Sequence, residues 1–412
     1  MKLFKLAFRN LTRNKRRTLI TLTAISGGLA LFIWSITLAT GSYQEMIRVG
    51  VSTMAGSVVV QGEGYQEEQE MEIGVPDADA VAETIAGLYP EARVIQRSFI
   101  AGLLNSPVNS IGIAATAIDP ALEPLVSDWH EKIVEGEFLS PDDPRGILIG
   151  AKMAEALGVG LGDKLVMMAQ GEEEVNSRLF RVTGVFRTGS AEMDGFLTLI
   201  HLDAARELLE QPGASTQVSL HLPDIADAPE ARDAILAALG ASAGAVEVLT
   251  WDEALPEMHM MLVRDEETNN VMMGFIGLIA AFGVLNTVLM SVMERMREFG
   301  VLLALGMPPS SLSSLVLLEG TLLGFVGVSL GLGLGLAASY PLIVYGIDFS
   351  SLMGMEQVDM GGVSMSAMIY GALDWERNIL FCVAGLVMTA LASVYPAWRA
   401  SKLQPVEAMN HI

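Results

Sequence analysis

The sequence lacks several features that would give it a chemistry of its own. Its single cysteine, Cys382, excludes an internal disulfide. No G-x-x-x-x-G-K-[ST] motif occurs, and no glycine is followed directly by lysine, so the chain has no phosphate-binding loop. The zinc-protease motif H-E-x-x-H is also missing. We therefore expect no catalytic residue, no metal and no cofactor in this chain, and any ATP hydrolysis would belong to another subunit.

Charge is distributed very unevenly along the 412 residues, which are 51% hydrophobic yet carry a net charge of −23. Residues 42–267 hold 39 of the 48 acidic residues and 13 of the 25 basic ones, which leaves this block at −26. Residues 1–18 carry seven basic residues and no carboxylate. The acidic block either attracts a basic partner or only favours solubility, and no nucleic-acid partner is expected.

Four apolar stretches are long enough to cross a bilayer, which takes roughly 20 residues. Because short cytoplasmic segments are rich in Lys and Arg, the charges place both chain ends inside. The sequence predicts an α-helical membrane protein with four transmembrane helices and a large α/β extracytoplasmic domain inserted between helices 1 and 2. The expected segments are a cytoplasmic basic, amphipathic helix at 1–17, spans at 18–40, 268–293, 311–344 and 378–397, the outer domain at 41–267, a cytoplasmic segment at 294–310, an outer loop at 345–377 and a cytoplasmic tail at 398–412.

Two alternatives concern the N-terminal region. A cleaved signal peptide would also begin with basic residues, but its apolar core is usually about 7 to 15 residues, shorter than the stretch from Thr18 to Ala39. The preceding residues either form an amphipathic helix on the membrane surface or only fix the orientation. The apolar residues at helical spacing are Leu3, Phe4, Ala7, Phe8 and Leu11.

The outer block has the pattern of a mixed α/β domain. Short β-branched or alternating runs predict strands at 57–61, 93–104, 110–118, 146–149, 164–169, 179–186, 196–200, 218–222 and 246–250. Helices are expected at 77–89, 151–157, 203–210 and 229–239. Because helices are scattered among strands, we expect two interleaved subdomains. Residues 65–72 and 170–177 are expected as acidic, exposed loops, and the residues after Trp251 as a helix continuous with the second span.

The third span is rich in glycine. Small residues at helical spacing let membrane helices approach closely, so we expect packing against another helix or another protomer through Gly320, Gly324, Gly327 and Gly331. The segment is so long that it must tilt, break or leave the membrane. Its G-x-S-x-G match lies inside a span, where no nucleophile elbow can form.

Three further features have more than one explanation. Glu319 is a carboxylate within the third span; it either pairs with Arg295 or Arg297 or relays protons. The Met258 to Met261 segment, MHMM, either packs a helix or binds a soft metal. Finally, the charged residues Glu294, Arg295, Arg297 and Glu298 have apolar neighbours in Met296, Phe299, Val301 and Leu302. That segment is either a helix docked in a partner or a loop that only sets topology.

Several motifs together resemble FtsX-like ABC permeases, the family of MacB-type exporters and lipoprotein-releasing Lol permeases. They are Ala7 to Leu11 with Arg16-Arg17-Thr18, Asn286, Glu294 to Glu298, Ala304-Leu305-Gly306, Glu319-Gly320, Tyr395-Pro396-Ala397 and Leu403 to Ala408. The resemblance covers both ends of the chain and the arrangement of one span, a large outer domain and three spans.

The resemblance implies a permease of the bacterial inner membrane that pairs with a second copy or a paralogue and is bound by a dimer of ABC ATPase subunits, which hold ATP and magnesium. The residues implied in ATPase coupling are Glu294, Arg295, Arg297, Glu298, Phe299 and Gly306. Substrates would then move on the outer side, with membrane lipid around the spans.

The sequence leaves three candidates for the function of the outer domain. Residues Gly56 to Gln61 with Gly64-Tyr65 look closest to the Lol-like branch, which implies lipoprotein release to a periplasmic carrier. MacB-like efflux of peptides or amphiphiles with an adaptor protein is the second. An FtsX-like scaffold that activates a cell-wall hydrolase is the third, although outer domains in that class are usually smaller.

Overall fold

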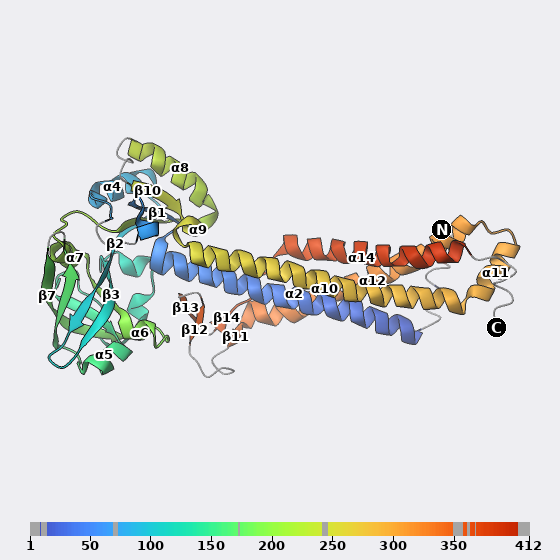
Figure 1. Ribbon diagram of the computed structural model, residues 1–412, viewed down its shortest axis with the longest axis horizontal. Helices are drawn as coiled ribbons and strands as arrows, with labels where there is room; N and C mark the ends of the chain where they lie inside the picture. The colour runs from blue at the N-terminus through green and yellow to red at the C-terminus, as the bar shows by residue number, and fades with distance from the viewer. Residues whose placement is uncertain are drawn as a thin grey trace. The chain divides into compact units, whose positions relative to one another are not determined.

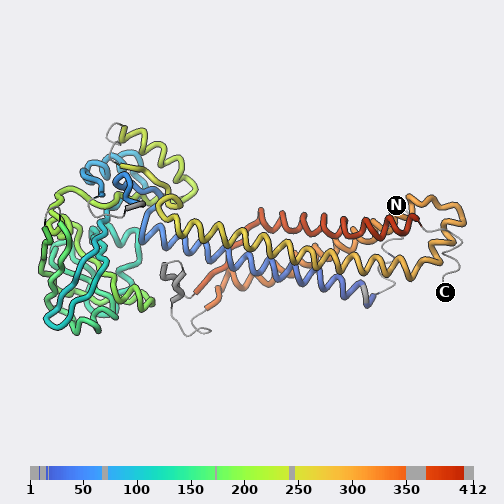
Figure 2. Tube along the Cα trace, viewed as in Figure 1, coloured from blue at the N-terminus to red at the C-terminus, as the bar shows by residue number. Residues whose placement is uncertain are grey.

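The computed structural model describes residues 9, 15–68, 73–171, 174–240, 246–348, 357–360, 363–366 and 368–402. The chain divides into two compact units (Figures 1 and 2). We call Met1–Gln44, Val263–Ile347 and Met368–Ile412 the helical unit, and Glu45–Leu262 with Asp348–Ala367 the α/β unit. Apart from Arg9 and residues 15–17, the N-terminal helix expected at 1–17 lies outside the described residues, as does the tail after residue 402.

Long helices dominate the helical unit, and two of them, α2 and α10, also supply residues to the α/β unit. The helices are α2 (Lys15–Gly50), α10 (Pro256–Glu294), α11 (Met296–Ala304), α12 (Pro309–Tyr345) and α14 (Trp375–Ser401). Two short strand pairs join β11 (Ile347–Asp348) to β14 (Met368–Ile369) and β12 (Gln357–Met360) to β13 (Val363–Ser366).

Among the described residues, four helices are long and apolar enough to cross a membrane, at the places where the sequence predicts spans. Each extends beyond the expected span. The first continues as helix to Gly50, because Met46 and Val49 pack on Met258 in a small apolar cluster. The third, α12, is one unbroken helix of 37 residues with Pro341 near its end, so of the three alternatives for this long segment the break does not occur.

Apolar faces of the four long helices meet in one core of the helical unit. Ile33, Val284, Val316 and Phe381 represent α2, α10, α12 and α14 in this cluster. Polar contacts join α2 to α10 as well: the hydroxyl groups of Thr21 and Thr287 lie 2.6 Å apart. The helices therefore form a bundle within the chain itself.

The α/β unit is built on one ten-stranded sheet with the order β10-β1-β9-β2-β3-β8-β5-β7-β4, and β6 pairs with both β2 and β7. Its strands are β1 (Val58–Gly62), β2 (Arg93–Asn105), β3 (Ser110–Ile118), β4 (Ile133–Gly136), β5 (Gly146–Gly150), β6 (Lys164–Gln170), β7 (Val175–Phe186), β8 (Leu197–His201), β9 (Gln217–His221) and β10 (Val246–Thr250). Because β6 returns to β2, the strands β2, β3, β8, β5, β7 and β6 close into a small barrel.

Helices and turns cover the sheet. The α-helices are α3 (Tyr65–Glu68), α4 (Ala78–Leu88), α5 (Ala151–Leu157), α6 (Met193–Phe196), α7 (Leu202–Leu209), α8 (Ala228–Leu239) and α9 (Trp251–Ala254). One π-helical turn, η1 (Val51–Ala55), follows α2 directly, and 3-10 turns lie at η2 (Glu123–Leu125), η3 (Trp129–Lys132) and η4 (Ile225–Asp227).

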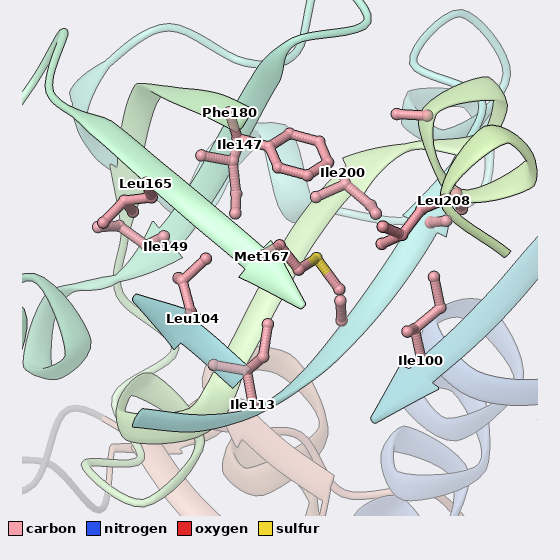
Figure 3. Close-up of a cluster of buried hydrophobic side chains, with 14 of the residues drawn as sticks. Ile100, Leu104, Ile113, Ile147, Ile149, Leu165, Met167, Phe180, Ile200 and Leu208 are labelled. Carbon is pink, nitrogen blue, oxygen red and sulfur yellow. The ribbon is translucent and has the colours of Figure 1, made fainter. Parts of the chain in front are cut away.

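The two largest apolar clusters of the α/β unit are separate, which indicates the two subdomains that the sequence predicts. The barrel encloses one core, in which side chains such as Leu104, Ile149, Met167 and Phe180 point toward one another (Figure 3). A second core lies between α4, α8 and the strands β1, β9 and β10. Strand β2 belongs to both, because Arg93–Arg97 pairs with β9 and Gly102–Asn105 pairs with β6. The chain begins in this second subdomain with β1 and α4, leaves it through β2 to build the barrel, and returns to it through β9.

All nine expected strands and all four expected helices of this block are present, with ends shifted by a few residues. The exposed strand β4 was not predicted, because it has no alternation of buried and exposed residues. Part of the expected loop at 65–72 is instead the helical turn α3, and residues 69–72 lie outside the described part. In the expected loop at 170–177, strand β7 already begins at Val175.

Candidate functional site

The charged segment between α10 and α12 folds as a short helix with defined ends. Helix α10 ends at Glu294, and Arg295 leaves the helical conformation with φ −110° and ψ 13° before α11 begins. At the other end, the Met307 amide donates to the Leu302 carbonyl and the Gly306 amide to the Leu303 carbonyl, both at 3.0 Å. This is the Schellman pattern, which favours glycine at the position that Gly306 occupies with φ +92°.

Arg295 links this turn to the third span. Its Nη1 donates to Glu319 Oε1 at 2.9 Å, and its Nε donates to Glu298 Oε2 at 3.1 Å. The guanidinium also lies over the Phe299 ring, 4.9 Å from its centre. The side chains of Arg295 and Glu319 are each only 8% exposed. Of the two arginines that the sequence offers to Glu319, Arg295 therefore makes a buried ion pair.

The structure separates the coupling residues implied by the resemblance into two groups. Arg295 and Phe299 lie inside the bundle with Met296 and Gly300, whereas the other charged residues point outward. We call the outward residues the exposed α11 face: Glu294, Arg297, Glu298, Val301 and Leu305.

The apolar part of this face differs from the sequence-based expectation. Val301 was grouped with Met296 and Phe299, but it is 44% exposed while they are buried. Leu305, which the sequence analysis names only as part of the Ala304-Leu305-Gly306 motif, is 80% exposed. Leu305 lies four residues after Val301 and eight residues after Arg297. Residues at such spacing share a helix face, so this spacing could have identified Leu305 as part of the exposed face. The segment thus presents charge and apolar surface together.

The glycine stripe of α12 packs against two helices of the same chain. A Cβ at Gly320 or Gly324 would overlap the side chains of Ser393 or Thr389 on α14, and a Cβ at Gly331 would lie 2.9 Å from Leu29 Cβ on α2. Gly327 faces Ile25 of α2 in the same way. The stripe therefore lets α12 approach both neighbours closely, as in other membrane helices with small residues at such spacing.

A second buried ion pair lies in the α/β unit and was not predicted. Arg97 of β2 contacts Glu123 through two hydrogen bonds, of 2.7 and 3.1 Å, and both side chains are at most 1% exposed. Arg97 Nη2 also donates to the Ser52 carbonyl of η1 at 2.6 Å. The Gln217 amide donates to the Met54 carbonyl of the same turn at 2.6 Å. These two side chains thus bind the π-helical turn to the sheet.

The structure shows the surroundings of two sequence motifs that could have carried chemistry. Met258 packs on Met46 and Val49 in an apolar cluster, which supports the packing role for this residue. Ser329, the central residue of the G-x-S-x-G match, lies exposed in the middle of α12 and not on a strand-to-helix turn. Within the described residues, no group of three His, Cys, Asp or Glu side chains is placed to hold a metal ion.

Two protein-family models match the chain. The model of the FtsX-like permease C-terminal region matches residues 270–405, which include most of α10 and all of α11, α12 and α14. The model of the MacB-like periplasmic core domain matches residues 18–238, more than half of the chain. The chain belongs to the FtsX-like permeases with a MacB-like periplasmic core domain. The family resemblance drawn from the sequence motifs is thereby confirmed.

Individual relatives come from the two branches that the motifs suggest. The lipoprotein-releasing system transmembrane protein LolC of Xylella fastidiosa is 22% identical over 97% of this chain and 96% of its own length. The macrolide export ATP-binding/permease protein MacB of Nitrobacter winogradskyi is 23% identical over 98% of this chain and 59% of its own length. The crystal structure of the periplasmic region of MacB from Actinobacillus actinomycetemcomitans aligns with a TM-score of 0.36 at 13% identity, covering 49% of this chain and 91% of that one.

These findings define this FtsX-like permease at the level of its class. It is an ABC transporter permease of LolC/MacB type, with four helices suited to a membrane and a MacB-like periplasmic core. Permeases of this class work with an ATPase partner.

Proposed function

We propose that this chain transmits ATP hydrolysis by a partner ATPase dimer to its periplasmic domain, and that this movement releases lipoproteins from the inner membrane. In this proposal the segment of residues 294–310 is cytoplasmic and the domain of residues 41–267 is inserted between the first two spans on the outer side. The chain itself is non-catalytic, and a second copy or a paralogue completes the membrane part.

The exposed α11 face carries the proposal. Its Arg297 and Glu298 offer both signs of charge, and Val301 and Leu305 offer apolar contacts for a groove in a partner. Beneath them, Arg295 and Phe299 attach the helix to α12 through Glu319. A partner that moves α11 therefore also moves α12, because the connection is buried and charged.

Charge supports the proposed orientation. The basic residues of 1–18 belong inside under the positive-inside rule, and four spans return the chain end to the same side. The acidic block of residues 42–267 then lies outside. Helices α2 and α10 each include residues of a span and residues of the α/β unit, so both helices belong to the path between span and domain.

The choice of lipoprotein release is supported by the LolC relative, which the alignment covers almost completely. MacB-like efflux of peptides or amphiphiles with an adaptor is the second candidate, because the MacB relative also aligns with nearly all of this chain. A signalling scaffold remains the third. The proteins that co-purify on the outer side distinguish them: a lipoprotein carrier, an adaptor with a channel, or a hydrolase.

The ATPase connection is tested by charge reversal on the exposed face. Affinity purification of the tagged full chain from its native membrane, with the ATP-binding subunit quantified by mass spectrometry, compares Arg297→Glu with the wild type. We expect about a tenfold loss of the ATPase, because opposing like charges across an interface weakens association by more than 1 kcal/mol. Leu305→Ser removes an apolar contact and gives a second, charge-independent loss.

Arg145→Glu is the matched control, since Arg145 is an exposed arginine of the α/β unit. It reverses the same charge and leaves ATPase recovery unchanged if the contact is specific to α11. Unchanged recovery with both Arg297→Glu and Leu305→Ser would show that the segment only sets topology. Purification of the wild type without any ATPase would overturn the proposal as a whole.

A further inference from the structure

A cavity of about 620 Å³ lies in the α/β unit, outside the barrel core. The last turn of α2 and η1 form one wall through Val49 and Met54. Strands β2 and β3 form the floor through Phe99 and Ala114, whose neighbours Ile100 and Ile113 point into the barrel instead. Successive strand residues face opposite sides of a sheet, so the cavity uses the outer surface of the barrel wall.

The remaining walls are aromatic and flexible. Trp129 of η3 is buried in the wall, while Phe196 of α6 and Met54 are 39% and 38% exposed, so their apolar surface is reached from solvent. Met193 is a further lining residue. Methionine side chains adapt to ligands of irregular shape. The volume falls within the range of small-molecule sites, which suits a ligand group rather than a folded partner.

The polar residues of the lining are three threonines, one carboxylate and one cation: Thr53, Thr116, Thr188, Glu192 and Lys132. The Lys132 side chain is only 13% exposed, and its Nζ lies 3.2 Å from Asp128 Oδ1 and 5.0 Å from the centre of the Trp129 ring. Asp128 is half exposed, which makes this ion pair weak. An ammonium group has three N–H donors, so Lys132 can contact Asp128 and a ligand oxygen together.

We propose that this cavity binds one long alkyl chain of an amphiphile, with Lys132 contacting a carbonyl or anionic oxygen at its head. An apolar chain gains about 0.8 kcal/mol for each methylene removed from water, and the aromatic and methionine lining provides that environment. The single cation at one side distinguishes this ligand from a plain hydrocarbon. Because η1 continues α2 directly, a ligand in the cavity would also contact the end of this span helix.

The inference deepens the proposed function, since lipoproteins and many exported amphiphiles both carry alkyl chains, but its test needs no ATPase. The full chain in nanodiscs is irradiated with a diazirine-bearing palmitate, and labelled peptides are identified by mass spectrometry. We expect labelling of Met193 to Leu197 and of the η3 peptide. Labelling of α14, which lies in the helical unit, serves as the internal standard.

Filling the cavity provides the decisive variant. Ala114→Trp displaces about two methylenes of a ligand and lowers the labelling ratio roughly tenfold, and Ala114→Leu gives an intermediate loss. Val134→Trp, at an exposed strand position outside the lining, keeps the wild-type ratio. Lys132→Gln lowers labelling by the palmitate but not by the matching long-chain alcohol, a difference that a merely structural lysine does not produce. Hydrogen exchange of β2 and β3 verifies that each variant is folded.

Competition identifies the source of the alkyl chain. Loss of labelling with a synthetic triacylated lipopeptide at concentrations where free palmitate is ineffective assigns the cavity to lipoproteins, and the reverse assigns it to single-chain amphiphiles. Absence of label in the η3 and α6 peptides, or label that Ala114→Trp does not reduce, would overturn the inference. Arg297→Glu would still report on ATPase coupling, so the two proposals fail separately.

Discussion

The α/β unit and the helical unit each contain a buried arginine–glutamate pair, and the two are built differently. Arg97 and Glu123 are almost fully enclosed and share two hydrogen bonds, with a third to the Ser52 carbonyl. Arg295 makes one such bond to buried Glu319 and another to Glu298, whose side chain is 48% exposed. The first pair holds a turn in one arrangement, whereas the second connects an outer surface to a span.

The different surroundings of the two ion pairs fit the different roles of the segments that they hold. A buried pair contributes little net stability, because desolvation offsets the attraction, but removal of one partner is costly. The π-helical turn that Arg97 holds therefore stays fixed relative to the sheet of its own unit. Arg295, by contrast, divides its donors between a buried and an exposed carboxylate, so a partner that contacts Glu298 competes for the group that holds Glu319.

The largest expected effect comes from Arg97→Met. It leaves the Glu123 carboxylate buried without its cation, which costs about 3 to 5 kcal/mol. Denaturant unfolding of the detergent-solubilised full chain, followed by hydrogen exchange in β1 and β9, measures the loss. Arg93→Met on the same strand is the control, because Arg93 is exposed and its replacement changes stability little.

A double variant sharpens this result. Arg97→Met with Glu123→Leu removes both charges and recovers most of the stability, as apolar replacements of buried pairs often do. The Ser52 carbonyl then lacks its donor, so exchange in η1 stays faster than in the wild type. A cost for Arg97→Met no greater than for Arg93→Met would mean that the buried pair does not hold this turn.

The second largest effect is expected from a change in the helix packing that positions Glu319. Gly320 follows it and faces Ser393 so closely that a Cβ would overlap the serine side chain. Gly320→Ala overpacks the contact between α12 and α14, at a cost of about 1 to 3 kcal/mol, and moves Glu319 away from Arg295. The thermal unfolding midpoint of the full chain in detergent measures it, together with ATPase recovery.

The same helix supplies the control for Gly320→Ala. Among the described residues, and apart from Gly333, its two chain neighbours and the adjacent backbone of its own helix, no atom lies within 4 Å of the position that a Cβ on Gly333 would take. Gly333→Ala is therefore neutral or slightly stabilising, because alanine has the higher helix propensity. Combining Gly320→Ala with Ser393→Gly should restore the midpoint. Equal effects of the two alanine variants would show that the stripe does not determine how closely the helices pack.

The third effect tests the surroundings of the enclosed pair. Burial, and the positive charge of Arg97, lower the pKa of His221 to about 3 from its ordinary 6.5. The unfolded chain binds a proton below 6.5 while folded His221 stays neutral, so this residue's contribution is present above 6.5 and is lost as the pH falls toward 3. At about pH 5.5 the loss amounts to roughly 1 kcal/mol.

A neutral replacement isolates the contribution of this one histidine. His221→Gln cannot titrate, so its stability falls less than that of the wild type between pH 7.5 and about pH 5.5. Chemical denaturation followed by circular dichroism at both pH values measures the difference. Parallel curves for the two proteins would mean that His221 is already accessible to protons in the folded chain, contrary to its buried Nε2.

Periodic patterns in the sequence predict its strands and spans, whereas features that depend on tertiary contacts cannot be predicted from it. Alternation identified strands such as β3, and apolar length identified the spans, because each pattern is periodic. Nothing local announces that Arg97 is buried or that its partner is Glu123, 26 positions later. The π-helical turn η1 likewise depends on donors from β2 and β9.

The candidate site was predicted in part for the same reason. The spacing of Glu319 and the two arginines reduced its partner to a choice of two, and only the fold selects Arg295. The division of the charged segment into a buried and an exposed group follows from helix periodicity once the helix ends are known. Those ends depend on Arg295 and Gly306, whose conformations the apolar pattern does not reveal.

The smallest expected effect on stability comes from Glu298→Gln. This variant tests most directly whether the Arg295 pair differs from the Arg97 pair. Glu298→Gln weakens a half-exposed ion pair, so the unfolding free energy changes by less than about 1 kcal/mol. Its effect on the ATPase is larger than on folding, because Glu298 belongs to the exposed α11 face. Glu45→Gln is the control: Glu45 forms an i,i+3 pair with Arg48 on α2. If Glu298→Gln lowers stability as much as Arg97→Met does, the Arg295 group is a second fixed pair, and the proposed exchange between buried and exposed carboxylates is wrong.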